Sequence, residues 1–177
     1  MNQSQNSKNR IIKDYEAFLS NPIEGCHVAM REGNLYLWDA IIMWEIVNRP
    51  IPLHLLIAFP QDYPTSAPSV GFSCSNIGYQ DGATSIEQSP TSPLKGKLTI
   101  CLDILGNFAQ YHKEWASTAK SGWSPAYTVS SLLVNLQAVL GTCALTLDGV
   151  SNERIKRECE LFMRNFNSSD MCPPINN

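Results

Sequence analysis

The sequence Leu-Thr-Ile-Cys-Leu-Asp-Ile-Leu, residues 98–105, is a short apolar run with Cys101 at its centre. Two long segments flank it, residues 74–97 and 106–122, which are rich in Gly, Ser, Thr and Pro or lack hydrophobic periodicity. Irregular segments of this length inside a compact domain are usually either functional or disordered. We therefore expect the surroundings of Cys101 to be functional or disordered.

The residues before this region predict one helix followed by strands. Residues 7–20 place apolar side chains on one helical stripe, and the helix is expected to stop at Asn21-Pro22, because a residue before proline disfavours the helical conformation. Four strand-like runs follow, at residues 27–31, 35–43, 53–59 and 69–73. A helix followed by consecutive strands is α+β in character.

The residues after this region predict two more helices. The first has Thr128 as its N-cap, a stripe of Leu and Val side chains, and an end near Gly141. The second covers residues 152–166, with apolar side chains at helical spacing and Ser151 as its cap.

A length of 177 residues fits one domain, expected over residues 7–166 with flexible tails at residues 1–6 and 167–177. The net charge of −3, without a basic stripe, predicts neither nucleic-acid nor anionic-membrane binding. No stretch has the length of a membrane-spanning helix, and the polar N-terminus lacks the apolar core of a signal peptide.

The six cysteines are scattered, without a close pair or a Cys-x-x-Cys motif. This spacing argues against a zinc site and against a secreted disulfide framework. Each cysteine is by default a small buried hydrophobe in a reducing compartment. We expect a cytoplasmic or nuclear protein with no metal and no cofactor.

Several motifs follow one another in a distinctive order. Trp38, on a predicted strand, precedes Phe-Pro-Gln-Asp-Tyr-Pro at residues 59–64 and Pro-Ser-Val-Gly-Phe at residues 68–72. Ile-Cys-Leu-Asp-Ile-Leu follows at residues 100–105, and Trp-Ser-Pro-Ala at residues 123–126 leads directly into the predicted helix. Four motifs in one order make chance similarity improbable.

In this order the motifs resemble the ubiquitin-conjugating enzyme family over residues 11 to about 140. The resemblance implies a four-stranded antiparallel meander flanked by an N-terminal, a central and a C-terminal helix. It also implies that Cys101 accepts ubiquitin or a ubiquitin-like protein from an activating enzyme as a thioester, and passes it to a ligase or a protein substrate. A thiolate is nucleophilic near neutral pH, and its thioester remains reactive toward an amine.

Each predicted catalytic residue has a structural alternative. Cys101 would otherwise be a buried strand cysteine, but its motif favours the nucleophile. Asp103 resembles the family's acidic residue beside the cysteine, or is a solvated loop carboxylate. Asp148 lies one position from where many members keep an acidic residue that orients lysine, although an Asp before Gly149 also suits a turn.

The resemblance further implies a surface on which activating enzymes and ligases dock. Pro125 and Ala126 belong to the loop before the predicted central helix. Thr65 lies in the proline-rich loop, at a position where an aromatic residue is common. Lys8 and Arg10 of the first helix would steer an acidic partner toward this surface. Trp123 lies at the start of the loop before the central helix, and a core role is favoured for it over a binding role.

The chain also departs from the family pattern. The usual His-Pro-Asn tripeptide is missing, and Ser-Pro-Leu at residues 92–94 occupies its place. Its asparagine is credited with stabilising an oxyanion or bracing a loop, so Asn76, Gln80 and Asn107 are candidate replacements. The loop after the cysteine is longer than in the minimal member, and Asn-Arg-Pro-Ile at residues 48–51 replaces Tyr-x-Gly-Gly.

Two other functions compete with this interpretation. A non-catalytic scaffold of the same fold would bind ubiquitin or a partner conjugating enzyme; retention of Cys101 argues against it, and loss of His-Pro-Asn argues for it. A cysteine hydrolase would need a histidine base, and none of His27, His54 and His112 lies in a recognisable hydrolase motif.

Overall fold

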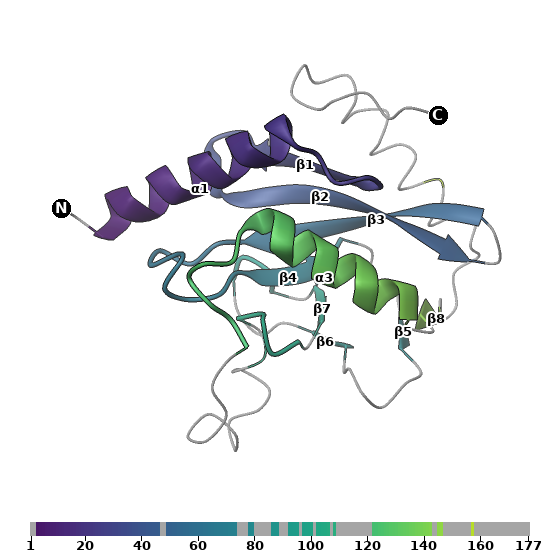
Figure 1. Cartoon of the computed structure of the whole chain (residues 1–177). Helices are drawn as coiled ribbons and strands as arrows, with labels where there is room; N and C mark the ends of the chain where they lie inside the picture. The colour runs from purple at the N-terminus through teal and green to yellow at the C-terminus, as the bar shows by residue number, and fades with distance from the viewer. Residues whose placement is uncertain are drawn as a thin grey trace.

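The computed structural model describes residues 3–46, 49–73, 78–79, 86–88, 92–95, 97–100, 102–106, 108, 122–142, 145–146 and 157. Helix α1 (Gln3–Ser20) precedes the strands β1 (Cys26–Arg31), β2 (Asn34–Ile46), β3 (Arg49–Ala58) and β4 (Ser69–Phe72) (Figure 1). Then come the short strands β5 (Gly78–Tyr79), β6 (Ile86–Gln88) and β7 (Leu98–Ile100), helix α3 (Val129–Thr142) and strand β8 (Leu145–Thr146).

The main sheet is antiparallel and has the strand order β1-β2-β3-β4-β7-β6, while β5 and β8 pair separately. The first four strands pair with their sequence neighbours, which confirms the predicted four-stranded meander and the α+β class. Strand β7 adds to the edge at β4 through the pair Gly71 and Thr99. This connection carries the chain to the segment around Cys101.

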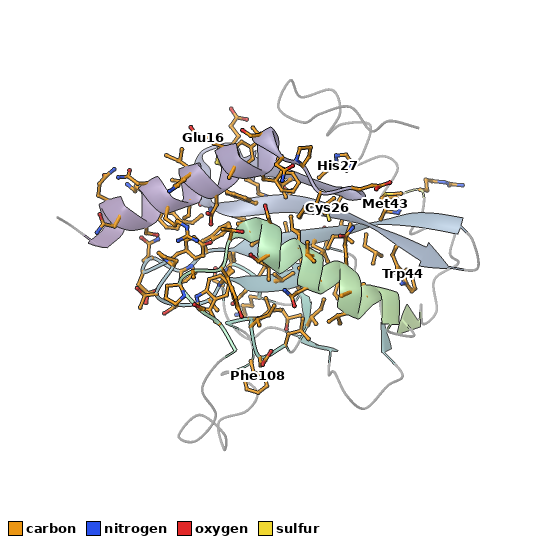
Figure 2. The ribbon with its side chains drawn as sticks, viewed as in Figure 1. Glu16, Cys26, His27, Met43, Trp44 and Phe108 are labelled. Atoms are coloured by element: carbon orange, nitrogen blue, oxygen red, sulfur yellow. The ribbon has the colours of Figure 1, made fainter. Side chains whose placement is uncertain are left out.

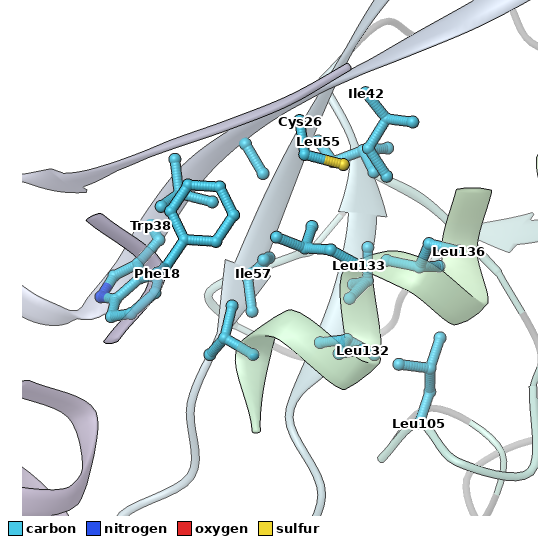
Figure 3. Packing of buried hydrophobic residues seen from close by; sticks show 14 of the residues in the cluster. Phe18, Cys26, Trp38, Ile42, Leu55, Ile57, Leu105, Leu132, Leu133 and Leu136 are labelled. Carbon is cyan, nitrogen blue, oxygen red and sulfur yellow. The ribbon is translucent and has the colours of Figure 1, made fainter. Parts of the chain in front are cut away.

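The larger hydrophobic cluster lies on one face of the sheet, under α1 and α3. Alternate side chains of β2 and β3 point toward the helices because successive residues of a strand face opposite sides. Figure 3 shows Phe18 of α1 and Leu132, Leu133 and Leu136 of α3 packed over the sheet residues Trp38, Ile42, Leu55 and Ile57. In the described part of the chain, α1 and α3 thus form a helical layer on one face of the main antiparallel sheet.

Helix α1 buries a narrower stripe than its sequence predicts. Ile11, Tyr15 and Phe18 are buried, whereas Ile12 and Leu19 are 41% and 38% exposed. Positions 11, 15 and 18 follow the i, i+4, i+7 spacing of one helical line, and the other two lie to its side. The helix also begins at Gln3, so residues 3–6, expected in a tail, continue it.

Helix α3 begins as predicted. The Ser131 N–H donates to Thr128 Oγ1 (3.2 Å), and the Thr128 N–H donates to Ser131 Oγ (3.2 Å). This reciprocal pair is a capping box in which serine replaces the usual glutamate. The cap places residues 123–127 directly before a rigid helix.

The opposite face of the sheet carries a polar cluster around the buried side chains of Asp39 and His54. Asp39 receives two hydrogen bonds from Arg31 (2.8 and 2.9 Å), and His54 Nε2 lies 2.7 Å from Asp39 Oδ1. Burial alone would raise the pKa of Asp39, but the bonds from His54 and Arg31 outweigh it and hold the pKa below its ordinary value. His27 lies on the same face, and burial lowers its pKa.

Of the predicted C-terminal helix at 152–166, only Arg157 belongs to the described residues, and the predicted tail 167–177 lies outside them. Among the described helices, none has the length and apolar character needed to cross a membrane. The same part of the chain contains no cluster of three or more His, Cys, Asp or Glu side chains that could hold a metal ion.

Candidate active site

Strand β7 and the turn at residues 102–106 lie on either side of Cys101 in the chain. Ile100, the last residue of β7, is buried in the core and pairs with Ile86 of β6. The turn is closed by a hydrogen bond from the Leu105 N–H to the Leu102 carbonyl (2.9 Å). Cys101 itself lies outside the described residues, but both of its chain neighbours have defined positions.

The turn after Cys101 is tied to two other loops. The Gly106 N–H donates to the Pro68 carbonyl (2.9 Å), and a methyl group on Gly106 would lie only 2.8 Å from the Ala67 carbonyl oxygen. On its other side, the Gly122 N–H donates to the Asp103 carbonyl (3.1 Å). The turn is therefore fixed between the proline-rich loop before β4 and the segment that leads to α3.

Asp103 is exposed and lies against Gly122. A methyl group on Gly122 would collide with the Asp103 carboxylate. The structure thus places the carboxylate at the junction of the cysteine turn and the 122–127 segment. Its supporting role in catalysis stays a prediction.

The other predicted catalytic residues, Asp148, Asn76, Gln80 and Asn107, lie outside the described residues. Phe108, described just beyond Asn107, donates its N–H to the Leu105 carbonyl (3.1 Å) and lies at the edge of the molecule in Figure 2. The roles of the four residues stay predictions.

The position expected for the His-Pro-Asn asparagine is occupied by a buried hydrocarbon. Leu94 is 2% exposed and packs with Leu37, Leu56 and Ala58 on the sheet face opposite the helices. A leucine side chain has no hydrogen-bond donor, so this side chain cannot stabilise an oxyanion. Any replacement donor must come from elsewhere in the chain.

The two predicted docking loops are brought together by Trp123. Its indole Nε1–H donates to the Pro64 carbonyl (2.8 Å), and its ring lies 6.0 Å from the Tyr63 ring, centroid to centroid. Trp123 is partly buried against the core, in line with the core role favoured from its sequence. Pro125, Ala126 and Thr65 are exposed around this junction.

Lys8 and Arg10, both predicted to steer partners, have different surroundings. Lys8 is exposed. The Arg10 side chain is only 23% exposed, and its guanidinium donates to the carboxylate of Asp14 and to the carbonyls of Pro125 and Tyr127. Sequence reasoning missed this network, although the i, i+4 spacing of Arg10 and Asp14 is a signal for an ion pair.

Cys26 is a structural cysteine. It is 1% exposed, its side chain lies among the core residues in Figure 3, and burial raises the pKa of its thiol to about 12. A thiol with this pKa is protonated near neutral pH and is a poor nucleophile. The environment of Cys26 therefore fits the default role expected for cysteines outside the motif.

Comparison with known proteins identifies the class to which this fold and these loops belong. The model of the family described as "Ubiquitin-conjugating enzyme" matches residues 10–169. The chain therefore belongs to the ubiquitin-conjugating enzyme family.

Individual relatives are distant. The chain is 28% identical over 140 residues to "Ubiquitin-conjugating enzyme E2 1" of Caenorhabditis elegans, covering 76% of this chain and 57% of that protein. It is 28% identical over 137 residues to "Ubiquitin-conjugating enzyme E2 2" of Mycosarcoma maydis, covering 76% and 59%. The chain thus spans less than two thirds of the length of these curated relatives.

A solved structure is also similar, the "Plasmodium vivax ubiquitin conjugating enzyme E2". It aligns with a TM-score of 0.51 and 22% identity, over 75% of this chain and 99% of that one. This likeness supports the fold.

Proposed function

We propose that this chain is an active conjugating enzyme in which Cys101 carries ubiquitin or a ubiquitin-like protein as a thioester. The observation that carries the proposal is the retention of Ile-Cys-Leu-Asp-Ile-Leu, with the turn after the cysteine anchored to Pro68 and to Gly122. The turn that follows the cysteine is thus held at two points, and positioning is a main source of rate in acyl transfer.

The proposed reaction has two steps. The Cys101 thiolate attacks the activated C-terminal carbonyl carbon of the modifier; a carbon–sulfur bond forms and the activating group leaves. An amine of a protein substrate, or a group on a ligase, then attacks the same carbon, and the Cys101 thiolate leaves. When lysine is the acceptor, its nitrogen loses a proton, a task for which Asp148 is the candidate.

The proposed partners are the modifier, an activating enzyme, a ligase and a protein substrate. Thr65, Pro125 and Ala126 form the proposed docking surface, and the exposed Lys8 supplies a positive charge on α1. Charge of this kind accelerates encounter more than it strengthens the complex. The cytoplasm or the nucleus is the proposed location, because the cysteine must stay reduced.

A non-catalytic scaffold is the second candidate, and Leu94 is the observation that favours it. A chain with a buried leucine in place of the asparagine lacks the usual donor for the second step. The first step does not depend on that donor in the same way. Charging of Cys101 therefore separates the two candidates.

The test is incubation of the protein with ATP, a panel of activating enzymes and their modifiers, followed by electrophoresis with and without thiol. We expect a shifted band that thiol removes, an ester resistant to thiol in Cys101→Ser, and no shift in Cys101→Ala. Cys26→Ala is the matched control, since its buried thiol should not be charged. Binding of a modifier without charging by any enzyme of the panel would instead indicate the scaffold.

A further inference from the structure

The Arg10 guanidinium joins three parts of the chain. Its Nε–H donates to Asp14 Oδ1 within α1 (2.9 Å). Its Nη1 and Nη2 groups donate to the carbonyls of Pro125 (3.0 Å) and Tyr127 (2.6 Å). The guanidinium carbon also lies 5.8 Å from the centre of the Tyr63 ring, which belongs to the proline-rich loop.

The partners of Arg10 are themselves held in place. The Tyr63 hydroxyl donates to Asp14 Oδ2 (2.5 Å), so one carboxylate accepts from both side chains. The side chain of Asp14 is 4% exposed and Tyr63 is 1% exposed. Burial, together with the bond to Asp14, raises the pKa of Tyr63, so the phenol stays a donor. The Asp14 carboxylate that binds Arg10 is therefore itself held in place.

The two carbonyls that accept from Arg10 flank Ala126 in the chain. Pro125, Ala126 and Tyr127 are exposed, so core packing does little to fix this piece of backbone. Two bonds further back, from Gly122 to Asp103 and from Trp123 to Pro64, fix the start of the same segment. At the far end, immediately before α3, the two bonds from Arg10 add to the local bond from the Tyr127 N–H to the Ser124 carbonyl.

We propose that Arg10 is a positioning residue, whose guanidinium holds residues 125–127 in the conformation that the activating enzyme recognises. The inference rests on the proposed function and deepens it. Arg10 acts here through backbone geometry, whereas the exposed Lys8 acts through charge alone. Lysine cannot replace Arg10, because one ammonium group cannot present the planar fork that reaches Asp14 and two carbonyls together.

The test compares Arg10→Lys, which keeps the charge and removes the fork, with Lys8→Gln, which removes an exposed charge. The rate of charging by ubiquitin-loaded activating enzyme is measured against the concentration of each variant, at low and high salt. We expect Arg10→Lys to raise KM at both salt concentrations and to leave kcat unchanged. The increase should be roughly tenfold, which is the affinity usually lost when hydrogen bonds from a charged group are removed. Lys8→Gln should raise KM at low salt only.

A wild-type KM for Arg10→Lys would overturn the inference, as would an effect that disappears at high salt like that of Lys8→Gln. A loss of stability alone would lower the melting temperature without raising the KM of the folded protein. If Arg10→Lys does not fold, Asp14→Asn serves instead, since it weakens the anchor of the guanidinium and keeps the side-chain volume. It should raise KM in the same salt-independent way.

A second measurement does not depend on charging. The Tyr127 N–H donates to the Ser124 carbonyl (2.9 Å), so its hydrogen exchange reports on the segment. Arg10→Lys should accelerate this exchange and leave the amides of β2 and β3 unchanged. Unaltered exchange overturns the inference whatever the charging result. Faster exchange together with an uncharged wild-type protein would refute the proposed function, while the fixation of the segment by Arg10 would stand.

Discussion

Ser7 is a fully buried residue of α1 whose hydroxyl oxygen has no hydrogen-bond partner among the described residues. A buried polar group without a partner loses its bonds to water and gains nothing in return, at a cost of about 1–3 kcal/mol. Ser7 lies one helical turn before Arg10 and Ile11, on the side of α1 that faces the rest of the molecule.

We expect Ser7→Ala to raise the free energy of unfolding by about 1 kcal/mol, because it removes the unpaired hydroxyl and alanine also favours helix. The measurement is the midpoint of urea unfolding. Ser20→Ala is the control, since the exposed Ser20 hydroxyl donates to the Glu16 carbonyl (2.8 Å) and its loss brings no such gain. A lower midpoint for Ser7→Ala than for the wild type would contradict this account of the site.

Helical periodicity alone could not separate the roles of Lys8 and Arg10. Both lie among the polar positions of α1, and helical periodicity shows only that neither belongs to the apolar stripe. Two of the partners of Arg10, the carbonyls of Pro125 and Tyr127, lie more than a hundred residues later in the chain, and every residue possesses such a group. Contacts to backbone carry no sequence signature, so only the folded arrangement shows them.

At the scale of the elements, strands β1, β2 and β3 bring His27, Asp39 and His54 onto one face of the sheet. His27 and His54 each pair with Ile41, on opposite sides of β2. The bonds of Asp39 to Arg31 and His54 favour its charged form, whereas burial of His27 favours its neutral form. The two groups therefore respond to acid in different pH ranges.

Acid should destabilise the protein first through His27. Its folded-state pKa is below the ordinary 6.5, so between these two values the unfolded chain binds more protons and stability falls as the pH falls. His27→Gln, which cannot be protonated, should lose less stability than the wild type as the pH falls from 7 through the ordinary histidine pKa. Urea midpoints across this range measure the difference, and parallel curves for the two proteins would argue against it.

The Asp39 contribution belongs to lower pH. Because its folded-state pKa lies below the ordinary 3.8, its stabilising effect is complete above that value and is lost as the pH falls through the folded-state pKa. Below the pH range in which His27 becomes protonated, the wild type and His27→Gln should therefore lose stability in parallel.

The long strands were predictable and the short ones were not. Strands β1 to β4 were all predicted to within a few residues, because each has enough residues to show alternation or an apolar run. Strands β5, β6 and β8 have two or three residues, too few to show a period of two. Their pairing depends on residues far away in the chain, which local patterns do not report.

At the scale of the whole molecule, the site is assembled from loops that several elements hold in place. The family resemblance implies that the loop beginning at Trp123 and the proline-rich loop share one docking surface, and in the structure the Trp123 indole bonds to the Pro64 carbonyl. This expectation came from the family resemblance, since no periodicity relates residues so far apart. The Tyr63 bond to Asp14 was not predicted, because a tyrosine reveals its partner only after folding.

The buried Leu94 predicts that charging and transfer differ in rate. Loading of Cys101 should be normal, whereas discharge to free lysine should be about a hundredfold slower than in a family member with the asparagine, the usual cost of one lost oxyanion donor. Pulse-chase discharge against lysine, cysteine and a peptide with a free N-terminal amine measures this. Rapid lysine discharge that survives Asn76→Ala, Gln80→Ala and Asn107→Ala would refute slow transfer and all three replacements.

Cys101 is the proposed carrier of the modifier. The most direct test of this role is mass spectrometry of the charged protein under non-reducing conditions, with peptide mapping of the modified residue. We expect the C-terminal glycyl remnant of the modifier on the peptide containing Cys101, removable by thiol, and absent from the peptide containing Cys26. A thiol-sensitive remnant on any other cysteine, or an unchanged yield of charged protein in Cys101→Ala, would contradict the proposed role.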